Sequence, residues 1–265
     1  MKSSSRAASI LNASSLSVDV TGVPSFLLAD LEVDNNLDFL LPTNLRLGHL
    51  VERVVAELIK ASSNFHVLHE NIQISEGNDT IGELDFIIQN KITEEVIHLE
   101  LAYKFYLFDP TLSSDAVNNW IGPNRNDSLK EKLNKLKSKQ FPLLYHSLTR
   151  SLLSEIEIDK VSQALCLMTS LFVPYGYEAD FPAEYRDAIK GYYLDLETLA
   201  TLDSLSKSYY LPAKKEWGME PCENESWTSF TEIEAQLSAS LDEKRALLCW
   251  QKHGEVYSEF FVAWW

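Results

Sequence analysis

Three charged side chains in two neighbouring apolar segments have the types and spacing needed for metal-assisted chemistry. Asp85 interrupts the apolar run 84–88, and Glu100 and Lys104 interrupt the run 96–107. In a β-strand, side chains alternate between two faces, so Glu100 and Lys104 share a face. A carboxylate among buried apolar residues is costly unless positive charge compensates it. We therefore expect two adjacent strands to present Asp85, Glu100 and Lys104 to one surface that binds a cation.

A divalent metal ion is the cation that fits these side chains. Mg²⁺ often takes only one or two protein carboxylates and completes its coordination with water and substrate phosphate. Such an ion can activate water and neutralise the charge on the reacting and leaving oxygens of a phosphodiester. The pattern therefore predicts a metal-dependent hydrolase that uses Mg²⁺ or Mn²⁺.

Two motifs carry a resemblance to the PD-(D/E)XK nuclease superfamily, namely GELDFII at 82–88 and HLELAYK at 98–104. The chain also resembles a bacterial domain-of-unknown-function family, DUF1853, which has a Gly-Pro-Asn segment before a Lys-rich helix, here at 122–124. This resemblance extends from about residue 45 to the C-terminus and is most specific between residues 47 and 136.

The resemblance implies a DNA nuclease with a restriction-endonuclease-like αβββαβ core. By the same resemblance, Asp85 and Glu100 hold the metal, and Lys104 acts at the scissile phosphate or positions the attacking water. One position departs from the superfamily pattern, because the lysine expected two residues after the glutamate is Ala102 here. Lys104 lies roughly 13 Å beyond Glu100 along an ideal strand. A folded lysine stem or a β-bulge would shorten that gap.

Further acids and one histidine accompany these residues. The superfamily often supplies an acid from its first helix, and Glu52 resembles it; the alternative is a glutamate that simply faces water. Glu83 shares a face with Asp85, roughly 7 Å away, and is a candidate metal contact or auxiliary acid. His98 lies on the face of Glu100, and we favour a hydrogen-bonded structural role for it over a metal contact.

The hydrophobic pattern places these residues in an α/β fold with a mixed sheet. It predicts a helix over 47–59 capped by Thr43 or Asn44, strands over 65–75, 84–88 and 96–107, a helix over 127–148 and a strand over 161–173. Residues 45–173 would form the nuclease-like core. Residues 1–44 are an expected N-terminal arm or cap, and residues 174–265 an aromatic-rich α+β extension.

The charge distribution restricts how such a protein could bind DNA. The net charge of −16 argues against tight, non-specific coating of nucleic acid. Between residues 120 and 150, however, seven basic residues oppose two acids. A run of this kind is either a solvated helix face or, beside a metal site, a phosphate contact. The candidate DNA contacts are Arg125, Lys130, Lys132, Lys135, Lys137 and Lys139.

A second reading is a nuclease-fold protein that no longer cuts and serves as a nucleic-acid-binding or protein-interaction module. The acidic net charge, Ala102 and the aromatic C-terminal third favour it. Paired aromatics in that third either pack, which we favour, or offer a surface to a second copy, a protein partner or unpaired bases. Three cysteines without a CxxC pair, no secretory signal pattern and no membrane-length apolar run predict a cytoplasmic protein without membrane contact.

Overall fold

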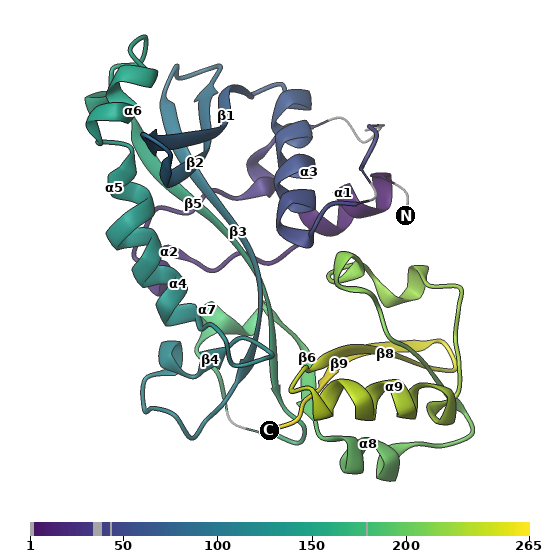
Figure 1. The fold of residues 1–265 in the computed structure, drawn as a ribbon. Coiled ribbons are helices and arrows are strands. Elements are labelled where there is room, and N and C mark those ends of the chain that lie inside the picture. Colours follow the sequence, from purple (N-terminus) through teal and green to yellow (C-terminus); the bar gives the residue numbers. More distant parts are fainter. Residues whose placement is uncertain (1–2, 34–38, 43, 179) are drawn as a thin grey trace. The chain divides into compact units, whose positions relative to one another are not determined.

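The structure is a computed structural model that describes residues 3–33, 39–42, 44–178 and 180–265. Its strands are β1 (Phe65–Glu76), β2 (Asp79–Asn90), β3 (Val96–Phe108), β4 (Trp120–Ile121), β5 (Ser162–Pro174), β6 (Ile189–Leu194), β7 (Lys207–Tyr210), β8 (Leu247–His253) and β9 (Val256–Val262). These nine strands of the described residues form a mixed sheet in the order β1-β2-β3-β5-β6-β9-β8-β7, with β4 paired to β3 (Figure 1). The predicted α/β class with a mixed sheet is confirmed.

Short and medium helices accompany the sheet. They are α1 (Ser3–Leu11), α2 (Val18–Thr21), α3 (Leu47–Ala61), α4 (Leu129–Lys135), α5 (Phe141–Leu143), α6 (Ser147–Leu152), α7 (Ala183–Arg186), α8 (Leu196–Leu202) and α9 (Phe230–Asp242). A π-helical turn, Leu136–Gln140, joins α4 to α5. Short 3₁₀ turns lie at Leu28–Asp30, Ala116–Asn118, Ile158–Lys160, Lys214–Glu216 and Pro221–Glu223. Among the residues described, no helix has the length and apolarity to cross a bilayer.

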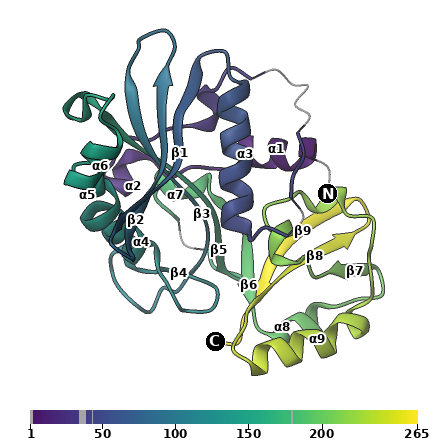
Figure 2. The same cartoon turned by 45° about the horizontal axis from the view of Figure 1, so that its top comes forward.

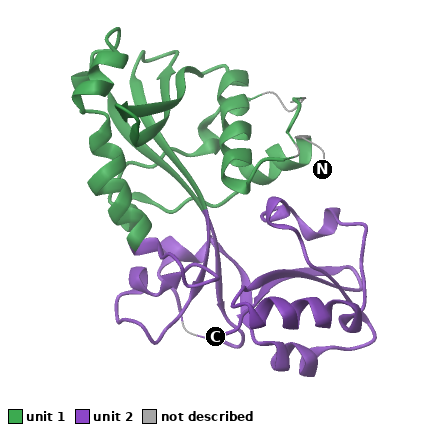
Figure 3. Ribbon diagram, viewed as in Figure 1, with its two compact units in different colours: residues 1–103, 131–168 green, residues 104–130, 169–265 purple. Residues whose placement is uncertain are grey.

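The chain folds into two compact units, each assembled from two separate segments (Figure 3). Unit 1 contains residues 1–103 and 131–168, and unit 2 contains residues 104–130 and 169–265. The predicted boundary at residue 173 lies five residues beyond the last residue of unit 1. Residues 104–130, which the sequence analysis assigned to the core, cluster with unit 2.

In unit 1, β1 and β2 form a long hairpin whose turn contains Gly77 at φ 61°. Figure 2 shows α3 and the α5–α6 segment on either side of these strands. The pairing of β2 with β3 is much shorter and ends at Phe86 opposite Leu99. Asp85 directly precedes Phe86 in β2. It therefore lies just outside the backbone hydrogen-bond ladder between β2 and β3.

Helix α3 matches the predicted helix, but its start differs from the expectation. The N-cap is Arg46, without a side-chain cap hydrogen bond. Asn44 lies two residues before that cap, so it cannot satisfy the first amides of the helix, and Thr43 lies outside the described residues. The helix is held instead by its buried apolar face, which includes Leu50, Val54 and Leu58.

The single helix predicted over 127–148 is wrong after Leu143, and before that point it contains a π turn. Leu129, Leu133 and Leu136 are buried at helical spacing, but the next buried residue, Phe141, follows only five positions later. The π turn absorbs this five-residue step. Pro142 adds a reason, because in a regular α-helix its ring would clash with the carbonyl four residues earlier. The helical segment ends at Leu143, before α6 begins.

In unit 2, α9 packs on the hairpin of β8 and β9. Leu237 of α9 is fully buried with Tyr209 and Phe260. At the C-terminus, Trp265 is half-buried and its indole donates a hydrogen bond to the carbonyl of Pro123 at 3.2 Å. The aromatics Tyr209, Phe260 and Trp265 therefore pack within the unit, as the sequence analysis favoured.

The core of unit 2 gives a stability prediction. Leu237→Ala should lower the free energy of unfolding by about 2–5 kcal/mol, because it removes buried methyl groups and leaves a cavity. Urea denaturation followed by tryptophan fluorescence is the suitable measurement, since all six tryptophans belong to unit 2. Leu205→Ala, at a fully exposed leucine, is the control and should have little effect. Equal effects of the two changes would contradict this core assignment.

Candidate functional site

Asp85 lies at the point in unit 1 where β2 separates from β3. Its Oδ2 accepts a hydrogen bond from the backbone N–H of Leu101 at 2.7 Å. The carboxyl group thus continues the bonding to β3 beyond the last paired position, Phe86 with Leu99. The side chain is half-buried, so this bond forms with limited access to water.

The surroundings of Asp85 disfavour its ionised form. Burial and the charge of Glu100 raise the pKa of Asp85 to about 8, with a smaller contribution from Glu52. The Leu101 amide and Lys132 lower this pKa, but they do not offset the other effects. At neutral pH Asp85 therefore carries its proton most of the time. A cation placed here would favour the ionised form by supplying the missing positive charge.

Glu100 is fully buried in β3 and accepts hydrogen bonds on both of its oxygens. Its Oε1 lies 2.9 Å from His98 Nε2, and its Oε2 accepts from Gln140 Nε2 at 2.8 Å. His98 is also fully buried, and its Nδ1 lies 3.1 Å from Gln163 Nε2. The structure thus places His98 in a hydrogen-bonded network around Glu100, the arrangement that the sequence analysis favoured.

Glu52 and Glu83 lie within electrostatic range of these acids. Glu52 of α3 is half-buried, and its Oε2 lies 3.0 Å from His49 Nδ1. The pKa of Glu83 is raised by its partial burial and by the charges of Glu52 and Glu100, while His49 lowers it. The acidic side chains identified from the sequence are therefore brought into one region of unit 1, with contributions from α3, β2 and β3.

The acids fit a metal that needs few protein ligands. Over the described residues, no three His, Cys, Asp or Glu side chains are arranged to hold one ion together. A magnesium ion commonly uses one or two carboxylates plus water and phosphate, which suits Asp85 with Glu100. The hydrogen bonds on Glu100 are of the kind that orient a ligating carboxylate.

Lys104 has a partner of its own in unit 2. Its ammonium group donates a hydrogen bond to Asp127 Oδ2 at 2.7 Å. The Gly-Pro-Asn segment makes this geometry possible, because a Cβ on Gly122 would lie only 2.0 Å from Asp127 Oδ1. A role for Lys104 at a scissile phosphate would require that ion pair to open.

Lys132 lies close enough to Asp85 to affect its ionisation. Its charge lowers the pKa of Asp85, and its Nζ donates to Gln140 Oε1 at 3.2 Å. The sequence analysis predicted Lys132 only as a DNA contact, and it missed Gln140 and Gln163. One signal for Gln140 was present, since it occupies the irregular step between buried Leu136 and Phe141.

The other basic residues of the predicted DNA contact differ in their surroundings. Arg125 pairs with Asp109 at 3.0 Å and stacks 4.5 Å from the ring centroid of Trp265. Lys137 lies against Gly22, where an added Cβ would approach its Nζ to 2.8 Å. The three remaining side chains, Lys130, Lys135 and Lys139, are exposed.

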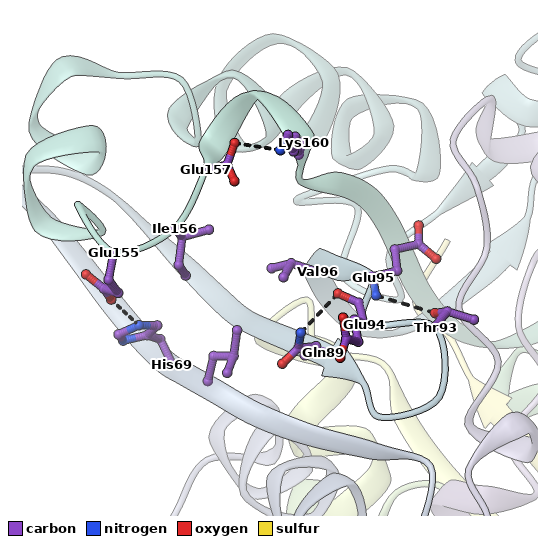
Figure 4. Close-up of a pocket in the computed structure, with 11 residues that line it drawn as sticks. His69, Gln89, Thr93, Glu94, Glu95, Val96, Glu155, Ile156, Glu157 and Lys160 are labelled. Atoms are coloured by element: carbon purple, nitrogen blue, oxygen red, sulfur yellow. Dashed lines mark hydrogen bonds and ion pairs between the residues drawn. The ribbon is translucent and has the colours of Figure 1, made fainter.

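A cavity of about 710 Å³ in unit 1 contains none of the predicted site residues. Figure 4 shows two ion pairs in its lining. His69 pairs with Glu155 at 2.8 Å, and Lys160 pairs with Glu157 at 2.7 Å. The lining of this cavity shares no residue with the acidic site of Glu52, Glu83, Asp85 and Glu100.

Residues 9–256 match the family model described as "Domain of unknown function (DUF1853)". The chain belongs to this family. A search of curated proteins and a search of solved structures each found no match. The segment matched by DUF1853 includes every residue of the acidic site, from Glu52 to Gln163.

The raised pKa of Asp85 makes stability depend on pH. The folded state favours the protonated form, so the stabilisation is complete below pH 4 and is lost as pH rises towards 8. Asp85→Asn keeps an oxygen that can accept from the Leu101 amide. Because asparagine does not ionise, the variant should not lose stability as pH rises towards 8. At pH 8 it should therefore raise the free energy of unfolding, by on the order of 3 kcal/mol.

Urea denaturation at pH 5 and pH 8, followed by circular dichroism, measures the effect of Asp85→Asn. The matched control is Asp79→Asn, which removes the same charge at the exposed start of β2. A rise in the free energy of unfolding at pH 8 that Asp79→Asn does not show would support the burial of Asp85 among acids. The same pH dependence in wild type and Asp85→Asn would refute it.

Proposed function

We propose that this DUF1853 protein is a metal-dependent nuclease of the PD-(D/E)XK type that hydrolyses phosphodiester bonds in DNA. The observation that carries the proposal is the convergence of Asp85 and Glu100 at the fork between β2 and β3. With β4, α5 and α6, which lie between β3 and β5, set aside, the order α3, β1, β2, β3, α4 and β5 is consistent with the restriction-endonuclease-like αβββαβ core that the motifs imply. The similarity to that core rests on the order of the elements and on the positions of the two motifs.

In this proposal Asp85 and Glu100 hold Mg²⁺ or Mn²⁺, and Glu52 and Glu83 supply further negative charge nearby. When bound, the ion would act as a Lewis acid and promote ionisation of a water molecule. Glu100 is held in place by His98 and Gln140. The protein's contribution is thus an oriented carboxylate, Glu100, beside an acid, Asp85, whose ionised form a cation would favour.

A lysine beside the acids would stabilise the charge that develops on phosphate. Lys132 is the better placed by its contacts, since its charge acts on Asp85. Lys104 stays the alternative that the motif implies. The exposed lysines Lys130, Lys135 and Lys139 would add sequence-independent contacts to the DNA backbone in an otherwise acidic protein.

A nuclease-fold module that binds nucleic acid or protein without cutting is the second candidate. Two observations favour it. Lys104 is already paired with Asp127, and Asp85 has a structural role as the acceptor for Leu101. The burial of Glu100 beside Asp85 counts against it, because two carboxylates so placed destabilise the fold when no cation is bound.

Cleavage of linear, nicked, branched and single-stranded DNA with Mg²⁺ or Mn²⁺ tests the proposal. Asp85→Ala and Glu100→Ala should each lower the rate at least about 100-fold, because each removes a metal ligand. Glu155→Ala, in the separate cavity, is the matched control and should cut like wild type. Cleavage that persists in Asp85→Ala and Glu100→Ala would place the activity elsewhere.

Lysine variants separate the two possible phosphate contacts. If Lys132 acts at the phosphate, Lys132→Met should lower the cleavage rate by about 100-fold while Lys104→Met has a smaller effect. The reverse order would return the role to Lys104. Absence of metal-dependent cleavage of any DNA in the panel would favour the binding module.

A further inference from the structure

Two glutamines flank the buried pair of His98 and Glu100, and each is oriented by a second group. Gln163 Nε2 donates to the carbonyl oxygen of Phe141 at 2.8 Å and lies 3.1 Å from His98 Nδ1. A carbonyl oxygen can only accept, so the NH₂ end of the amide must face Phe141. Its second N–H is then directed at the histidine.

The orientation of Gln163 decides which ring nitrogen of His98 carries the hydrogen. Because Gln163 presents a donor, His98 Nδ1 must be the acceptor. In the neutral ring the hydrogen then resides on Nε2, which donates to Glu100 Oε1 at 2.9 Å. The ring is also held by an edge-on contact with Phe141, at 5.8 Å between centroids.

Gln140 is oriented in the same way from the other side. Its Oε1 faces the ammonium group of Lys132, which can only donate, at 3.2 Å. Its Nε2 therefore donates to Glu100 Oε2 at 2.8 Å. Both oxygens of Glu100 thus receive an N–H donor whose direction is fixed by a further group.

The π turn brings these groups to one place. Gln140 is its last residue and Phe141 follows directly. One residue fewer would rotate everything after the turn by about 100° around the helix axis. The Gln140 amide and the Phe141 carbonyl would then no longer face the pair of His98 and Glu100.

We infer that Gln163 and Gln140 are positioning residues that fix the tautomer of His98 and the orientation of the Glu100 carboxylate. The hydrogen-bond part of this inference stands alone, and its metal part rests on the proposed function. Gln140 further links Lys132, the proposed phosphate contact, to Glu100, the proposed metal ligand. Partners of this kind typically contribute a factor of about 10 to 100 in metal affinity.

The tautomer is tested by ¹⁵N NMR of the whole chain of 265 residues. In the wild type, His98 should carry its hydrogen on Nε2, and Gln163→Met should let the Nδ1–H form appear. Gln140→Met should not change the tautomer, because the Gln140 amide bonds the carboxylate of Glu100 and not the ring of His98. A wild-type His98 with hydrogen on Nδ1 would overturn the inference, and this result needs no variant to fold.

Mn²⁺ affinity, measured by isothermal titration calorimetry, tests the positioning of Glu100. Gln163→Met and Gln140→Met should each bind Mn²⁺ about 10- to 100-fold more weakly than wild type. Gln89→Met is the matched control, because it removes an amide that bonds a backbone carbonyl, that of Glu94, in the same unit. The control should bind Mn²⁺ like wild type.

The outcomes separate this inference from the proposed nuclease. Wild-type affinity in both Gln163→Met and Gln140→Met would overturn the positioning role and leave the nuclease standing. A wild type that binds no Mn²⁺ would overturn the metal site itself. The NMR result would still decide whether Gln163 fixes the tautomer of His98.

Discussion

The burial of the Glu100 carboxylate is the constraint on which the rest of the site depends. Its side chain has no exposed surface, so every hydrogen bond that water would supply must come from the protein. His98 and Gln140 meet that demand. They in turn require Gln163, Lys132 and an irregular helix that puts the right groups within reach. Asp85 cannot ionise freely beside this anion, and its pKa is raised accordingly.

Much of the fold could be predicted from the sequence because its signals are local. Alternation predicted strands within β1 and β2, and helical spacing predicted α3. The acids Asp85 and Glu100 stood out because charge inside an apolar strand is unusual. The π turn could not be predicted in this way, since a single five-residue step is easily taken for the end of a helix. The turn directly precedes Phe141, which is buried, and Pro142.

The partners of the site residues were harder to predict, since they come from distant segments. Gln163 is 65 residues from His98, and nothing in the apolar run around it indicates a histidine partner. Lys104 shows the same dependence on distant segments. Its motif predicts a catalytic lysine, and in the structure its ammonium group bonds Asp127, which comes from a loop further along the chain. The sequence pattern thus identifies which residues are chemically unusual, whereas long-range contacts in the fold determine which groups each of them bonds.

The interleaving of the two units has a consequence for how the chain can be made and divided. Unit 1 lacks its second segment until residue 168 has been synthesised. Residues 104–130 belong to unit 2, and the rest of that unit, residues 169–265, is synthesised later still. No single cut releases either unit as one continuous fragment. During synthesis the first hundred residues should therefore stay incompletely packed while the next sixty emerge, which is a reason for assistance by chaperones.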